Sequence, residues 1–187
     1  GAGKSFCAVN LAAVSAQSGQ KVCLVDADLR RGYLRRYFNV SKNQAGLAEV
    51  MSGEAKLDDV LVEGPIPGLM FLPTGRYPPN PSELLMRPAF AEMIKELDQR
   101  FELTICDAPP VLAVTDPIVI GRAVGAMIAV VRYDDTPIGE VQALMRAAAA
   151  AGVRITGAIL NAYDPKRAKG RDGYNYTYRY DYQSRKD

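Results

Sequence analysis

The sequence contains no histidine and no tryptophan among its 187 residues. Without histidine, the chain cannot form a Ser-His-Asp triad, a Cys-His pair, a histidine-ligated zinc site or an imidazole acid–base group. Any catalysis must therefore use carboxylates, lysine, hydroxyl groups or metal-bound water. The formal net charge of +2 is also small, so bulk electrostatics does not favour binding to nucleic acid, and we expect no nucleic-acid partner.

Cysteine is scarce, and long apolar runs are absent from the sequence. The three cysteines, Cys7, Cys23 and Cys106, are odd in number, lie in apolar stretches and lack CxxC spacing. This pattern favours buried thiols in a reducing compartment, and we expect a cytoplasmic domain. No apolar run approaches the roughly 20 residues that a membrane-spanning helix needs, and no signal-peptide pattern is present. If the parent protein touches a membrane, we expect its anchor to lie outside this chain.

Apolar, strand-like runs alternate with amphipathic stretches along most of the chain. This alternation predicts an α/β fold with a mostly parallel sheet and helices on both of its faces. The expected helices are Phe6–Ser18, Ser82–Gln99, a helix that begins at Asp116, and Glu140–Ala151, and the expected strands are Val22–Val25, Leu69–Leu72, Leu103–Cys106, Ala126–Val131 and Ile155–Leu160. The pattern stops after Asn161, so we expect a core domain over residues 1–163 and a flexible tail over residues 164–187.

The chain opens with Gly1-Ala2-Gly3-Lys4-Ser5, which matches the second half of the phosphate-binding pattern GxxxxGK[ST]. Glycines let backbone N–H groups close around phosphate oxygens, and a helix that follows points its positive end at them. Lys4 can then reach the β and γ phosphates, while the Ser5 hydroxyl can hold Mg²⁺. The alternative is a glycine-rich N-terminal fragment in front of an ordinary helix.

Three aspartates follow the ends of two apolar strands. Asp26 and Asp28 come after Val22–Val25, and Asp107 comes after Leu103–Cys106. Taken singly, each aspartate is more often a helix cap or a turn residue. In a parallel α/β sheet, however, such strand ends meet at the ligand-binding edge. Beside a GKS sequence, the three carboxylates predict Mg²⁺-assisted phosphoryl transfer, in which one of them accepts the proton of an incoming hydroxyl.

Together these segments resemble the bacterial tyrosine kinases of capsule and exopolysaccharide synthesis, known as BY-kinases. The matching segments are the Walker A loop at Gly1–Ser5, the Walker A′ strand hhhDxDxR at Val22–Arg30, the Walker B strand at Leu103–Asp107, the signature PPNPSELL at Pro78–Leu85, and a C-terminal tyrosine cluster. The resemblance implies a P-loop NTPase fold of the MinD and ParA type. The family's first P-loop residues and its EX₂RX₂R segment are not in this chain, so we expect it to be part of a longer protein.

The resemblance also implies a set of site residues for ATP or ADP and for Mg²⁺. The implied nucleotide-binding residues are Gly1, Ala2, Gly3, Lys4, Ser5, Phe6 and Asn161, the implied metal-binding residues are Ser5, Asp26 and Asp107, and the implied catalytic residues are Lys4, Asp26, Asp28 and Asp107. Asn161 matches the place where MinD-like ATPases have an asparagine that contacts adenine. Its alternative role is that of a turn residue at a strand end.

Half of the ten tyrosines lie in one window, as Tyr174, Tyr176, Tyr178, Tyr180 and Tyr182. One interpretation is an edge strand with an aromatic face, because strict alternation puts all five phenols on one side. A second is a platform for base stacking. The third, which the resemblance favours, is a substrate segment for autophosphorylation, in which each phosphate adds roughly −1.5 to −2 charges to a locally basic tail.

Four arginines lie in the run from Arg30 to Arg36. This run is either a site for phosphate, phosphotyrosine or a membrane activator, or simply a solvated surface.

The resemblance predicts an ATP-dependent protein-tyrosine autokinase that phosphorylates its C-terminal tyrosines and regulates exopolysaccharide polymerisation and export. Five acceptors that use one site need freedom to slide past it, which favours transfer to the tail of another chain. The expected partners are other copies of the chain, including ring-shaped oligomers, a membrane activator or polysaccharide co-polymerase segment outside this chain, and a cognate tyrosine phosphatase. We expect the chain to be a cytoplasmic domain of an inner-membrane protein. Two rival functions stay open: a MinD- or ParA-like ATPase switch with water as the acceptor, and a nucleotide-gated assembly scaffold.

Overall fold

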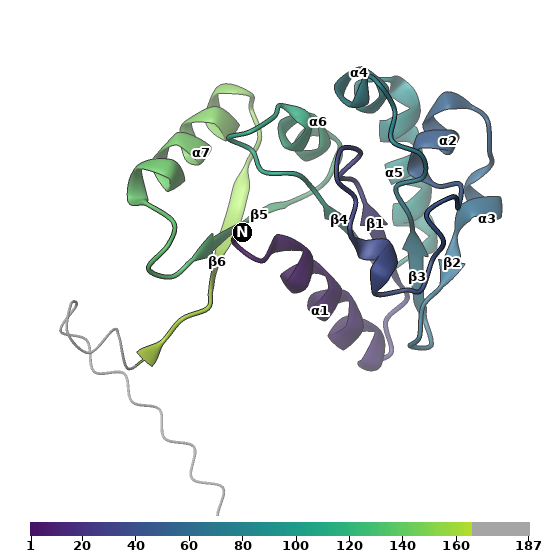
Figure 1. Cartoon of the computed structure of the whole chain (residues 1–187), viewed down its shortest axis with the longest axis horizontal. Coiled ribbons are helices and arrows are strands. Elements are labelled where there is room, and N and C mark those ends of the chain that lie inside the picture. The colour runs from purple at the N-terminus through teal and green to yellow at the C-terminus, as the bar shows by residue number, and fades with distance from the viewer. Residues whose placement is uncertain (166–187) are drawn as a thin grey trace, which may run out of the picture.

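The computed structural model describes residues 1–165, in which helices and strands alternate along the chain (Figure 1). The helices are α1 (Lys4–Gln17), α2 (Leu47–Ser52), α3 (Leu57–Val60), α4 (Pro81–Leu85), α5 (Pro88–Arg100), α6 (Asp116–Ala123) and α7 (Ile138–Ala150). The strands are β1 (Val22–Asp26), β2 (Val62–Glu63), β3 (Leu69–Leu72), β4 (Leu103–Asp107), β5 (Met127–Arg132) and β6 (Ile155–Asn161). None of the helices in this part of the chain is long and apolar enough to cross a membrane. The clustered tyrosines of the tail lie outside the described residues.

The strands form two sheets within residues 1–165. The first sheet has the order β2-β3-β1-β4, in which β1 runs parallel to both β3 and β4, and the short β2 runs antiparallel to β3. The second sheet consists of β5 and β6, which also run parallel. The predicted parallel pairing is therefore confirmed. Within the described residues β4 and β5 share no backbone ladder, so the strands form two separate ladders.

Strand β1 forms the centre of the core, and all five of its residues are buried. Successive side chains of a strand point to opposite faces of the sheet. Val22 and Leu24 accordingly pack in one cluster with Ala12 and Ala16 of α1. Cys23 and Val25 pack in a second cluster, whose members come from α2, α3, α4, α5 and α6. The prediction of helices on both faces is thus confirmed.

The expected single helix over residues 82–99 is wrong, because the structure has two helices there. Helix α4 ends at Leu85, and α5 begins at Pro88. Between them Arg87 has an extended backbone, with φ −66° and ψ 144°. Proline lacks the N–H that a helix needs and disfavours helical backbone in the residue before it. The short elements α2, α3 and β2 are not predicted from the sequence, since two to six residues carry little periodicity.

The three cysteines are all free thiols, but they differ in burial. Cys23 lies fully inside the core, where burial raises its pKa to about 12 and keeps it protonated at neutral pH. Cys7 and Cys106 are only partly buried. The expectation of buried thiols is therefore fully confirmed only for Cys23.

We expect Phe71→Ala to lower the free energy of unfolding by about 3–5 kcal/mol, because the change opens a cavity in the core. Phe71 is fully buried in β3 and stacks on Phe38 at 4.2 Å between ring centroids. Urea denaturation followed by circular dichroism measures the loss. The control is Phe6→Ala, whose ring is 57% exposed and whose removal should change the unfolding free energy by less than about 0.5 kcal/mol. Equal losses in the two variants would contradict this placement of the core.

Candidate active site

The first residues form a turn that leads directly into α1. Gly3 caps this helix with φ +87°, a left-handed backbone that glycine adopts without strain. A side chain at Gly3 would also collide with the Asn161 amide nitrogen. Lys4 and Ser5 therefore occupy the first turn of α1, where backbone N–H groups have no partner within the helix and the positive end of the helix favours an anion.

The Ser5 hydroxyl connects this turn to the end of β4. Its Oγ donates a hydrogen bond to Asp107 Oδ2 at 2.5 Å. Burial of Asp107 raises the pKa of its carboxyl, and this effect outweighs the hydrogen bond from Ser5 and the positive charge of Lys4, which lower it. The structure thus brings together the predicted phosphate turn and the predicted metal carboxylate.

Asp26 lies beside Asp107, because the two residues pair in the register of β1 and β4. It is 1% exposed, and its Oδ2 accepts a hydrogen bond from the Leu34 N–H at 3.0 Å. Its Oδ1 is buried and has no hydrogen-bond partner within residues 1–165. Burial, together with the nearby charge of Asp107, raises the pKa of Asp26 to about 7. A buried carboxylate oxygen without a partner is suited to accept a cation.

The oxygen donors at this place fit Mg²⁺. In the part of the chain that the structure describes, no three acidic or thiol side chains gather closely enough to hold a metal on their own. Magnesium, however, is usually bound through one or two carboxylates, with waters and substrate phosphates as the remaining ligands. Asp26, Asp107 and the Ser5 hydroxyl would supply the protein's share, and their roles stay predictions.

Asp28 lies on the loop that follows β1 and is less buried than Asp26. Its Oδ1 accepts hydrogen bonds from the Arg30 N–H at 3.1 Å and the Arg31 N–H at 2.9 Å. These two bonds fix the loop in a tight turn and use only one of the two carboxylate oxygens. Asp28 is therefore held at the rim of the site, whereas Asp26 lies at its floor.

An ion pair between the partly exposed Arg30 and the buried Asp116 anchors this loop, and sequence reasoning missed it. The Arg30 Nε donates to Asp116 Oδ2 at 2.7 Å, and Ser82 Oγ donates to Asp116 Oδ1 at 2.5 Å. Burial alone would raise the pKa of Asp116, but the hydrogen bonds from Arg30 and Ser82 outweigh it and lower the pKa. The arginine of the DxDxR sequence and the serine of PPNPSELL were visible in the sequence. For Asp116, the sequence pattern predicts only that a helix begins there.

The second sheet holds the other side of the N-terminal turn. Asn161, at the end of β6, donates from Nδ2 to the Ala2 carbonyl oxygen at 2.9 Å. Arg132, its partner in the β5–β6 register, donates to the Gly1 carbonyl oxygen at 3.4 Å. Asn161 therefore reaches the predicted nucleotide-binding turn, while its contact with adenine stays a prediction. Phe6 points outward from α1 and is largely exposed.

The arginines between residues 30 and 36 do not form one cationic surface. Arg30 pairs with Asp116, and Arg36 lies over the ring of Tyr33, with 4.6 Å from its guanidinium carbon to the ring centroid. Arg35 lines a separate cavity next to the site. The structure thus gives these neighbouring side chains three different surroundings.

Comparison with known proteins gives consistent relatives. A family model described as an AAA domain matches residues 1–132. The putative tyrosine-protein kinase EpsB of Ralstonia nicotianae is 39% identical over 185 residues, which are 99% of this chain and 23% of EpsB. The tyrosine-protein kinase etk of Escherichia coli K12 is 45% identical over 159 residues, which are 85% of this chain and 22% of etk. The chain thus spans about a quarter of the length of these curated relatives.

Solved structures show the same likeness in three dimensions. The kinase domain of Escherichia coli tyrosine kinase ETK matches with a TM-score of 0.84 at 42% identity, covering 96% of this chain and 68% of that domain. MinD of Pyrococcus horikoshii, in a complex with Mg-ADP, matches with a TM-score of 0.74 at 24% identity, covering 90% of this chain and 72% of MinD. These matches confirm the predicted MinD-like P-loop NTPase fold.

We expect the stability of the metal-free chain to fall as the pH rises from 5 to 8, because Asp26 must lose its proton while buried. Its pKa is raised to about 7 in the folded chain from 3.8, so folding is favoured while the group is protonated and this advantage is lost as the pH approaches 7. The Asp26 contribution should be on the order of 2 kcal/mol between pH 5 and pH 8. Urea denaturation at both pH values measures it. In Asp26→Asn this part of the pH dependence should disappear, and an unchanged dependence would contradict the assignment.

We expect Arg30→Ala to lower the free energy of unfolding measurably more than Arg31→Ala does, because it removes the cation that pairs with the buried Asp116 carboxylate. Of the side-chain hydrogen bonds to Asp116, only the one from Ser82 then stays in place. Arg31→Ala is the matched control, since the described Arg31 side chain forms no ion pair, and its effect should stay within about 0.5 kcal/mol. Replacing Asp116 by Asn in the Arg30→Ala background should restore part of the loss. Thermal denaturation of the four chains decides the outcome, and equal effects of Arg30→Ala and Arg31→Ala would refute the pair's importance.

Proposed function

The chain belongs to the bacterial tyrosine kinase, or BY-kinase, family, and from this we propose that it is an ATP- and Mg²⁺-dependent protein-tyrosine kinase. The observation that carries the proposal is the hydrogen bond of 2.5 Å from Ser5 to Asp107, with Asp26 next to Asp107 in the sheet. This arrangement combines a phosphate-binding helix start with two carboxylates and a hydroxyl suited to Mg²⁺. The names of the curated relatives, tyrosine-protein kinases, support the same chemistry.

In the proposed site, residues 1–5 surround the nucleotide phosphates, and Asn161 braces this turn through its bond to Ala2. Lys4 offsets the negative charge of the β and γ phosphates. Ser5, Asp26 and Asp107 hold Mg²⁺, which as a bound cation neutralises charge that develops on the phosphate oxygens. The complex of MinD with Mg-ADP shows that this fold accommodates such a ligand pair in that protein.

The transfer itself makes one bond and breaks one bond. A tyrosine hydroxyl oxygen bonds to the γ-phosphorus, the bond between this phosphorus and the β–γ bridging oxygen breaks, and ADP leaves with the electron pair. The phenolic proton passes to a carboxylate. We assign this role to Asp28, because it lies at the rim of the site, whereas Asp26 is buried at the floor and suits the metal.

The proposed acceptors are the five clustered tyrosines, Tyr174, Tyr176, Tyr178, Tyr180 and Tyr182. Five acceptors that use one site need freedom to slide past it, and the tail of a neighbouring chain has that freedom. We therefore place the transfer between chains. In this role the chain acts with other copies of itself and with a membrane activator segment, at the cytoplasmic side of an inner membrane, in exopolysaccharide or capsule export. A cognate phosphatase would reverse the modification.

The decisive experiment mixes two variants of the chain with ATP and Mg²⁺ and maps phosphate by mass spectrometry. One variant carries Lys4→Met and keeps its tyrosines, while the other keeps Lys4 and has the five tyrosines changed to Phe. We expect phosphate on the tail of the Lys4→Met chain only in the mixture. Each variant alone serves as the control and should stay unmodified.

Other outcomes distinguish the rival functions. Phosphate on the unmixed wild-type chain but none on the Lys4→Met tail would show transfer within one chain. Release of inorganic phosphate with unmodified tyrosines would indicate an ATPase switch. Nucleotide binding with neither product would indicate an assembly scaffold.

A further inference from the structure

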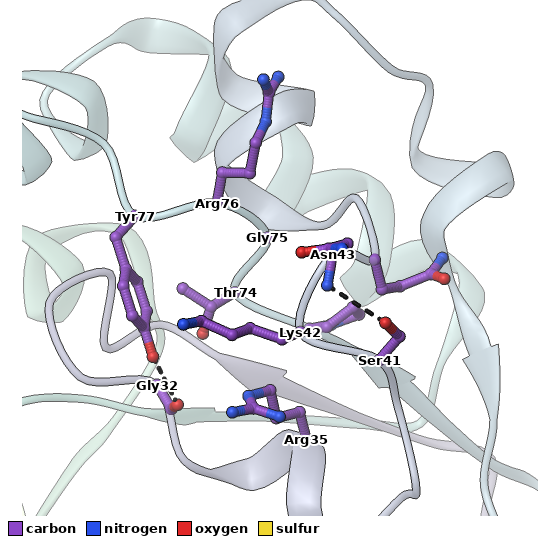
Figure 2. A pocket seen from close by; sticks show the side chains of 11 residues that line it. Gly32, Arg35, Ser41, Lys42, Asn43, Thr74, Gly75, Arg76 and Tyr77 are labelled. Carbon is purple, nitrogen blue, oxygen red and sulfur yellow. Dashed lines mark hydrogen bonds between the residues drawn. The ribbon is translucent and has the colours of Figure 1, made fainter.

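A cavity of about 170 Å³ lies next to the proposed active site (Figure 2). Its walls come from the 3₁₀ turn after β1, from the loop at residues 41–44, and from the loop that follows β3. The lining residues that matter for its chemistry are Gly32, Arg35, Ser41, Lys42, Asn43 and Tyr77. The cavity therefore opens near the carboxyl ends of β1 and β3, the edge at which parallel α/β sheets bind ligands.

Two cations face this cavity without partners. Figure 2 shows the side chains of Arg35 and Lys42 reaching into the same space between Tyr77 and the loop of Ser41 and Asn43. Neither side chain forms an ion pair or a hydrogen bond with any residue that the structure describes. No aspartate or glutamate is among the lining residues. Two like charges in one concave site repel each other, and an anion between them would remove that repulsion.

Arg76 also borders the cavity, but its charge is already used. Its N–H and Nε donate to Glu49 Oε1 at 3.1 and 2.9 Å, and its guanidinium also pairs with Glu54. Glu49 is buried and further accepts the Gly46 N–H at 2.7 Å. Burial alone would raise the pKa of Glu49, but these hydrogen bonds lower it, so it stays charged. This network holds the wall of the cavity in place and leaves Arg35 and Lys42 as the cations available to a ligand.

The cavity wall is also fixed on the side of the active site. The Tyr77 hydroxyl donates to the Gly32 carbonyl oxygen at 3.0 Å, which ties the loop after β3 to the loop after β1. A side chain at Gly32 would collide with Thr74 Oγ1, so only glycine allows this approach. The Tyr77 ring thus forms a fixed aromatic wall beside the two cations (Figure 2).

We propose that this cavity binds a phosphate monoester, with Arg35 and Lys42 as its charge partners and the Ser41 hydroxyl and Asn43 amide as neutral donors. Phosphate carries two negative charges and accepts several hydrogen bonds, which matches two free cations beside polar side chains. At about 30 Å³ for each water, the volume of about 170 Å³ holds about six waters, enough for a phosphate group with part of an attached ring. The proposed kinase activity would itself supply such a ligand as phosphotyrosine, and a free phosphate ester is the other source.

Titration calorimetry with the 187-residue chain tests this site directly, without any turnover. The probes are inorganic phosphate, O-phosphotyrosine, and tyrosine as the comparison that lacks the phosphate group. We expect both phosphorylated probes to bind and tyrosine to bind at least about tenfold more weakly. Tighter binding of O-phosphotyrosine than of inorganic phosphate identifies the aromatic ester as the ligand source, whereas equal binding identifies the free phosphate group.

The variant Arg35→Gln with Lys42→Gln should weaken binding of both phosphorylated probes by about tenfold or more. The matched control is Arg31→Gln, which removes an arginine of the same run outside the cavity and should change the affinity by less than about twofold. Inorganic phosphate can also bind the N-terminal turn, so the comparison is repeated in the Lys4→Met background, where the loss caused by the paired change should persist. Absence of binding, or loss through Lys4→Met and not through the paired change, would overturn the proposal. Neither result would bear on the kinase assay, which follows transfer from ATP.

Discussion

The meeting of two buried carboxylates at the ends of adjacent parallel strands is the constraint on which the site depends. The register of β1 and β4 sets Asp26 beside Asp107, and the Ser5 hydroxyl reaches Asp107 from the start of α1. Two such groups in a low-dielectric interior repel each other when both are charged, and burial raises the pKa of each. Two charged carboxylates at this place therefore destabilise the metal-free protein, and a divalent cation between them would relieve their repulsion.

The surrounding loops are held by a few polar contacts between segments far apart in sequence. Arg30 and Ser82 converge on the buried Asp116, which anchors the loop carrying Asp28. Glu49 plays a similar part for the loop after β3, through its bonds to Gly46 and Arg76. Both carboxylates are buried, and both oxygen atoms of each accept hydrogen bonds. These bonds fix each loop on the rigid core, and the fixed loops position the active-site side chains.

The sequence predicted the main elements because their patterns are local. The runs that became β1, β3 and β4 are short and mainly apolar, and the ends of β1 and β4 carry the aspartates, so the edge that forms the site could be anticipated. The helix break at Pro88 is also a local signal, but the helical periodicity on both sides of it predicts a single helix. The division into two sheets could not be read from the chain, because strand order and ladder continuity depend on which strands come into hydrogen-bonding distance.

By itself, the sequence determined which functional groups are available for catalysis. It has no imidazole, it begins with a glycine-lysine-serine turn, it places carboxylates at strand ends, and it gathers tyrosines near residue 180. Only the tertiary structure decided which of these groups meet. It paired Arg30 with Asp116, placed Arg36 over Tyr33, and left Arg35 facing a cavity with Lys42. The physical reason is that partners of a charged side chain come from distant loops brought together by folding, which no local pattern encodes.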